Sequence, residues 1–140
     1  MDPEKARRAA PAAGGGPGGG ETILLVEDNR DLAEAYAALF ACLGYRVLTA
    51  ASAEEALEVT AREAGRVALV ITDLTLPGMS GTDLGQALRA RGDAAPVIVL
   101  SGYPPAGAAG DAIAAWLQKP LEVEELLAAV RRALARPAAR

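Results

Sequence analysis

Short apolar runs alternate along this chain with stretches in which apolar residues recur at helical spacing. Five of the runs are short and bounded by polar, Gly or Pro residues, which is typical of strands. They span residues 22–26, 45–50, 67–72, 97–100 and 114–118. The first of them is apolar nearly throughout, so we expect a strand that is buried on both faces, as strands of parallel sheets are.

Helical periodicity fills the spaces between these strands. Apolar residues first recur at i, i+3, i+4, i+7, i+8 and i+11, and Gly44 then follows in the position where helices often end in a left-handed residue. The members of this stripe are Leu32, Ala35, Tyr36, Leu39, Phe40 and Leu43. Ser52 and Glu55 have the spacing of a capping box, which predicts a second helix to about residue 64. Further helices are predicted over 82–91 and 123–134.

Strands that alternate with helices imply parallel pairing through right-handed crossovers, with helices on both faces of the sheet. We therefore expect an α/β fold of the flavodoxin-like, doubly wound type, with five parallel strands in the order 2-1-3-4-5. Between Ser101 and Lys119 the chain is short and rich in Gly, Pro and Ala. The fourth helix of that fold should therefore be shortened or missing.

The two ends of the chain differ from its middle. Residues 1–20 contain 14 Gly, Ala or Pro residues and too little apolar surface to offset the entropy of ordering. We expect a disordered tail or linker over 1–20, one folded domain over 21–136 and a short tail over 137–140.

Composition excludes several classes of function. The net charge is −4, with no basic stripe, so nucleic-acid binding by this chain alone is not expected. No apolar run approaches the ~20 residues that span a bilayer, and we expect a cytoplasmic location with no membrane contact. The sequence has no His, which excludes a histidine ligand, base or phosphohistidine within it. Its one cysteine, Cys42, is expected to pack as a small apolar residue.

Polar residues stand where four of the predicted strands end. Glu27 and Asp28 follow the first strand, Asp73 the third, Ser101 the fourth and Lys119 the fifth. In the expected order these strands are neighbours, so the side chains should converge at one edge of the sheet. Three converging carboxylates repel one another and favour a proton or a cation, and an all-oxygen cluster suits Mg²⁺. A phosphate at this edge could bridge the metal and the lysine.

These residues carry a resemblance to a known family. The acidic pair, the run Asp-Leu-Thr-Leu-Pro-Gly-Met-Ser-Gly over 73–81, the hydroxyl of Ser101 and the Lys119-Pro120 pair resemble the receiver domain of two-component response regulators. The style of the sequence is similar to receivers of hybrid histidine kinases. Each signal alone is weak, and the specificity lies in their order and their places at strand ends.

The resemblance implies a phosphoacceptor that works with Mg²⁺. Asp73 would form an aspartyl phosphate after attack on a phosphodonor, namely a histidine kinase or a histidine phosphotransfer protein. Asp28 and Asp73 would contact the metal directly and Glu27 through a water. The resemblance also assigns the backbone carbonyl of Thr75 to the metal.

Further roles follow from the same resemblance. Lys119 and Ser101 would contact phosphoryl oxygens, Ser101 and Trp116 would form a switch, and the bond before Pro120 would be cis. We expect no enzyme in the ordinary sense, but a phosphoacceptor that phosphorylates and slowly dephosphorylates itself. Only a helix and a short tail follow Pro120, so output should pass through an unknown partner protein.

Simpler explanations exist for each residue. Asp73 could cap a turn, Asp28 or Asn29 could serve only as a helix N-cap, and Trp116 could be a core residue. A receiver-like scaffold that works without phosphorylation is one alternative function. A phosphatase with an aspartate nucleophile is another, but such enzymes carry a second acid two residues later, where this sequence has Thr75.

Overall fold

The computed structural model describes residues 19–63, 65–103 and 113–135, which form five strands and four helices. The elements are β1 (Thr22–Val26), α2 (Arg30–Cys42), β2 (Arg46–Ala50), α3 (Ala53–Glu63), β3 (Val67–Asp73), α4 (Gly81–Ala90), β4 (Val97–Ser101), β5 (Ile113–Gln118) and α5 (Val123–Ala135). The predictions for the two tails and for a shortened helix before β5 concern residues that lie almost entirely outside the described ranges.

The strands form one parallel sheet in the order β2-β1-β3-β4-β5, which confirms the predicted fold. The order places the ends of β1, β3, β4 and β5 side by side. Val26 at the end of β1 is opposite Thr72, and Asp73 at the end of β3 is opposite Leu100. Residues that follow these strand ends therefore share one edge of the sheet.

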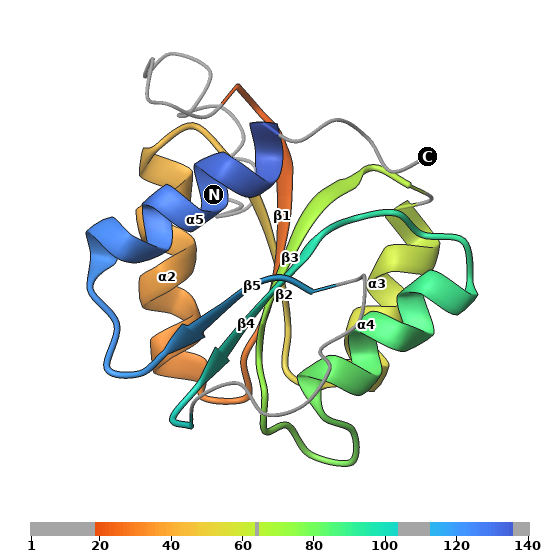
Figure 1. The fold of residues 1–140 in the computed structure, drawn as a ribbon. Coiled ribbons are helices and arrows are strands. Elements are labelled where there is room, and N and C mark those ends of the chain that lie inside the picture. The colour runs from red at the N-terminus through yellow and green to blue at the C-terminus, as the bar shows by residue number, and fades with distance from the viewer. Residues whose placement is uncertain (1–18, 64, 104–112, 136–140) are drawn as a thin grey trace.

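Helices cover both faces of the sheet, with α2 and α5 on one side and α3 and α4 on the other (Figure 1). Each side has its own apolar core. Phe40 and Leu126 are fully buried on the first side, and Leu84 and Leu88 on the second. All five residues of β1 are buried, as its apolar sequence predicts for a central strand of a parallel sheet.

Helix α2 buries most of the predicted stripe together with a row of alanines beside it. Phe40 is buried and Tyr36 and Leu43 pack against the core, whereas Ala35 is exposed. The other buried residues of the helix are Ala33, Ala37 and Ala41, which the prediction did not include. The helix is rich in Ala, and Ala33, Ala37 and Ala41 form the small-residue face that packs on the sheet. Hydrophobicity alone does not distinguish these buried alanines from the exposed ones.

The burial of the alanine row also explains why the prediction for Cys42 is wrong. Cys42 is the last residue of α2, and its side chain is exposed rather than packed. It follows Ala41, which lies on the buried stripe, and the next position of a helix turns about 100° away from that stripe. The thiol therefore contributes no apolar burial.

The helix starts follow the predicted capping chemistry with one difference. Asn29 is the N-cap of α2, where its side-chain oxygen accepts the N–H of Leu32 at 3.0 Å. Before α3, Ser52 Oγ accepts the N–H of Glu55 at 3.1 Å, but the Glu55 carboxylate accepts the N–H of Ala51 rather than that of Ser52.

None of the four helices is long and apolar enough to cross a membrane.

Candidate functional site

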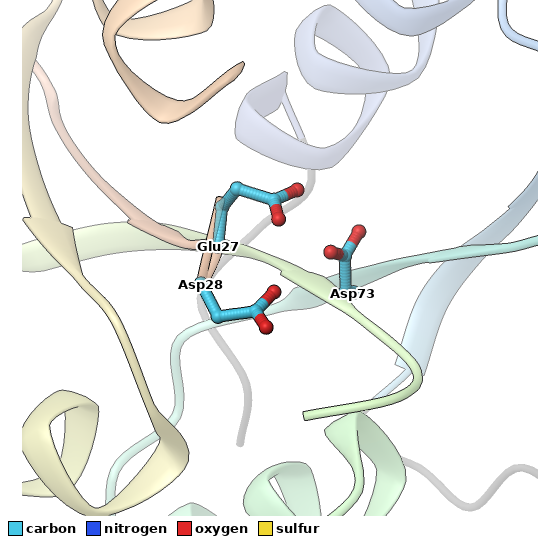
Figure 2. A group of neighbouring side chains, drawn as sticks. All are labelled: Glu27, Asp28 and Asp73. Carbon is cyan, nitrogen blue, oxygen red and sulfur yellow. The ribbon is translucent and has the colours of Figure 1, made fainter. Parts of the chain in front are cut away.

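Three carboxylates meet at the edge of the sheet where β1 and β3 end. One oxygen from each of Glu27, Asp28 and Asp73 lies within 4.8 Å of the other two, and Figure 2 shows the three side chains pointing toward a common space. Glu27 and Asp73 are 5% and 7% exposed, whereas Asp28 is open to solvent. The cluster therefore has two buried acids and one exposed acid at its mouth.

Burial and the neighbouring carboxylate raise the pKa of Glu27. Loss of solvent and the nearby Asp73 carboxylate raise the pKa of Glu27 from 4.5 to about 7. The N–H of Asn29, donated to Glu27 Oε2 at 3.0 Å, and the charge of Lys119 oppose this rise. Without a metal ion in the cluster, Glu27 therefore keeps its proton at pH values at which a solvated glutamic acid has lost it.

Lys119 supplies the positive charge of the site. Its ammonium lies 2.9 Å from Asp73 Oδ1, with the lysine side chain 37% exposed. The contact is an ion pair at hydrogen-bonding distance, and its carboxylate partner is almost fully buried. Burial lowers the pKa of Lys119, but the carboxylates of Asp73 and Glu27 outweigh it and raise that pKa overall.

Ser101 and Trp116 both contact the backbone of Tyr103. Ser101 is the last residue of β4 and is buried, and its Oγ accepts the Tyr103 N–H at 2.9 Å. The indole N–H of Trp116, on β5, donates to the Tyr103 carbonyl at 3.1 Å. Trp116 is partly buried against the core beneath α3 and α4. It thus has the core contacts of the simpler explanation together with a polar link to the residue beside Ser101.

The Lys119–Pro120 peptide bond is cis, as the resemblance implies. The N–H of Lys119 donates to the carbonyl of Ser101 at 2.6 Å, which ties the end of β5 to the end of β4. Thr75, two residues beyond Asp73, is exposed in the loop between β3 and α4. The structure thus brings Glu27, Asp28, Asp73 and Lys119 together and places Ser101 at the neighbouring strand end.

Two further residues near the site carried no recognisable signal in the sequence. Tyr36 on α2 is partly buried, and its pKa is raised by that burial and by the carboxylates of Asp73 and Glu27, while Lys119 opposes the rise. Its helical spacing identified it only as a candidate core residue. Thr72 is fully buried, and its hydroxyl donates to the backbone carbonyl of Asp73 at 2.9 Å.

Comparison with known proteins agrees with this geometry. The family model of the response regulator receiver domain matches residues 23–131. The chain is 40% identical over 114 residues to the response regulator protein FleR of Pseudomonas aeruginosa. The matched region covers 79% of this chain and 24% of FleR. It spans between 24% and 51% of the length of the first curated relatives it matches.

Solved structures of receiver domains and response regulators also resemble this chain. The receiver domain of the hybrid histidine kinase CckA superposes with a TM-score of 0.71 at 34% identity, covering 81% of this chain and 98% of that one. The response regulator TrrA of Thermotoga maritima, solved in complex with Mg²⁺ and BeF, superposes with a TM-score of 0.72 at 28% identity, over 81% and 99% of the two chains.

A flavodoxin-like sheet with an acidic cluster and a lysine at its carboxyl edge can hold a divalent cation beside a phosphoryl group. The chain belongs to the family of response regulator receiver domains of two-component systems. Such domains receive phosphate from histidine kinases and bind Mg²⁺ at an acidic site.

Proposed function

We propose that Asp73 is the phosphoacceptor of this receiver domain. The observation that carries the proposal is the position of Asp73, a buried carboxylate that ends β3, faces the Lys119 ammonium at 2.9 Å and shares a cluster with Glu27 and Asp28. Burial of carboxylates beside one another costs free energy, so the arrangement calls for a functional explanation. An aspartate held in this way is suited to form a bond to phosphorus.

In the proposed reaction a carboxylate oxygen of Asp73 attacks phosphorus, and the bond from phosphorus to the leaving group of the donor breaks. Lys119 would neutralise the charge on a phosphoryl oxygen, and the Ser101 hydroxyl would donate to another after giving up the Tyr103 N–H. Phosphoryl transfer depends mostly on position and charge neutralisation, which these residues supply without a separate base.

The donor set of the cluster fits Mg²⁺. Three carboxylates within 4.8 Å offer oxygen ligands only, and the exposed Asp28 leaves room for waters and phosphoryl oxygens. Asp28 and Asp73 would hold the ion directly, Glu27 through a water, and Thr75 through its backbone carbonyl. The ion would offset the negative charge that gathers as phosphate approaches three acids.

The proposal extends to the organisation and partners of the chain. The receiver unit would span residues 21–136, which encloses the matched range 23–131. The donor would be a histidine kinase or a histidine phosphotransfer protein, and the signal would pass to a partner protein rather than to nucleic acid or a membrane. Ser101 and Trp116, both linked to Tyr103, would report the phosphorylation state to that partner.

The test is intact-mass spectrometry after incubation with acetyl phosphate and Mg²⁺. We expect one added phosphoryl group that hydroxylamine removes, no addition to Asp73→Asn, and normal addition to Asp83→Asn, an exposed acid on α4. A scaffold that works without phosphorylation would give no addition in any variant. A phosphatase would release phosphate continuously without a stable adduct.

A further inference from the structure

The backbone carbonyl of Asp73 is held from two sides, although only its carboxylate takes part in the site described above. Strand β1 ends at Val26, opposite Thr72, so Asp73 lies one residue beyond the β1–β3 ladder. The Thr72 hydroxyl, itself fully buried, donates to the Asp73 carbonyl oxygen at 2.9 Å. A carbonyl past the end of the ladder is thereby satisfied by the preceding side chain.

Gly81, the first residue of α4, lies on the other side of the Asp73 carbonyl. A Cβ placed on Gly81 would lie 2.5 Å from the Asp73 carbonyl oxygen and 3.0 Å from Thr72 Cγ2. The N–H of Gly81 also donates to the Leu74 carbonyl at 2.8 Å, so the start of α4 is seated on the backbone that follows the acceptor. Space rather than backbone conformation therefore requires glycine at this position.

We propose that Thr72 and Gly81 are positioning residues for phosphoryl transfer, because together they fix the peptide unit from which the Asp73 side chain projects. The inference rests on the proposed function. The direction of the Asp73 Cα–Cβ bond follows from its backbone, and a displacement of about 1 Å at a reacting group can cost roughly a hundredfold in rate. Neither residue touches phosphate or metal in this account.

The competing explanation is that both residues only support the fold. Thr60 offers a matched control, because it is also a buried threonine whose hydroxyl donates to a backbone carbonyl, that of Leu57 at 3.0 Å. It lies on α3, away from the acidic cluster. Thr60→Val and Thr72→Val therefore make the same chemical change in two buried threonines, only one of which donates to the Asp73 carbonyl.

The experiment compares rates of phosphorylation by acetyl phosphate at saturating Mg²⁺, far below the melting temperature of each variant. We expect Thr72→Val to react about tenfold more slowly than wild type, and Thr60→Val to remain within about twofold of wild type. Thr72→Ser keeps the hydroxyl and should recover most of the rate. Equal rates for Thr72→Val and Thr60→Val, or a Thr72→Ser rate as low as that of Thr72→Val, would overturn the inference.

Gly81→Ala tests the second side of the carbonyl. It should also react slowly, and Thr72→Ser should not rescue it, since the nearest atom is the Asp73 carbonyl oxygen and not the threonine methyl. Rescue by Thr72→Ser would show a contact between side chains only and would refute the role of Gly81. If Gly81→Ala does not fold, the Thr72 and Thr60 variants decide the matter.

The outcomes separate the two proposals. Wild type that takes up no phosphoryl group in this assay contradicts the proposed function. Wild type phosphorylated on Asp73, together with Thr72→Val reacting as fast as Thr60→Val, contradicts only the positioning role.

Discussion

Glu27 should make the metal-free protein lose stability as the pH rises. Its pKa is about 7 in the folded state and close to 4.5 when solvated, because folding buries it beside Asp73. A carboxyl whose folded pKa is raised contributes stability fully below the unfolded pKa and loses it as pH rises through the folded pKa. The contribution of Glu27 is therefore present below about pH 4.5 and absent above about pH 7.

The size of the effect follows from the width of that window. One pKa unit corresponds to about 1.4 kcal/mol, so the full rise from 4.5 to about 7 corresponds to roughly 3–4 kcal/mol, most of which is lost between about pH 5 and pH 8. Glu27→Gln mimics the protonated acid at every pH. This variant should match wild type at low pH and exceed its free energy of unfolding by roughly 3–4 kcal/mol at about pH 8.

Urea denaturation in the presence of a chelator measures this difference, and Glu34→Gln, an exposed acid on α2, serves as the control. Comparison with Glu27→Gln cancels the titration of the groups that do not interact with Glu27. Addition of Mg²⁺ at high pH should restore most of the stability of wild type, because a cation relieves the repulsion that the proton relieved. The same pH dependence in wild type and in Glu27→Gln would refute the reasoning.

Three further predictions concern the metal, the lysine and the core. Asp28→Ala should weaken Mg²⁺ binding in calorimetry far more than Glu27→Ala does, and equal losses would contradict the distinction between a direct contact by Asp28 and a contact through water by Glu27. Lys119→Met should lower the rate of phosphorylation by acetyl phosphate at least about tenfold, because it removes the cation beside Asp73; an unchanged time course by mass spectrometry would count against that role. Phe40→Ala should lower the free energy of unfolding by about 3–5 kcal/mol in urea and leave Mg²⁺ affinity unchanged, whereas a loss below about 1 kcal/mol would contradict full burial.

The strand pattern predicted the sheet because buried parallel strands leave a strong signal. Runs such as 22–26 and 67–72 are apolar on both faces, and the alternation of strands and helices leaves few permitted orders. Once the order is known, the convergence of Glu27, Asp73 and Lys119 follows from their places at strand ends. The sequence could therefore predict which site residues meet.

The sequence could not predict which side of an alanine-rich helix faces the sheet. Ala33 and Ala37 are buried while Ala35 is exposed, although all three have the same hydrophobicity. The choice depends on how closely the backbone of α2 approaches the sheet, and that distance is a tertiary property. The error over Cys42 has the same origin.

The sequence was equally unable to predict the contacts that Thr72 and Gly81 make with the backbone of Asp73. In the sequence, Thr72 was only the last residue of a predicted strand and Gly81 only the end of the run 73–81, so neither suggested a contact with the Asp73 carbonyl. The link from Ser101 through Tyr103 to Trp116 depends on backbone groups that every residue carries. Sequence patterns identify side chains, whereas these interactions arise from the path of the backbone.

The most direct test of the central claim is to locate the phosphoryl group on the chain. After reaction with acetyl phosphate and Mg²⁺, reduction with borohydride converts a phosphorylated aspartate to homoserine, which peptide mass spectrometry then identifies by position. We expect homoserine at position 73 and unmodified aspartate at Asp28 and Asp83. Modification at either of those residues with Asp73 intact, or no modification at all, would contradict the assignment of Asp73 as the phosphoacceptor.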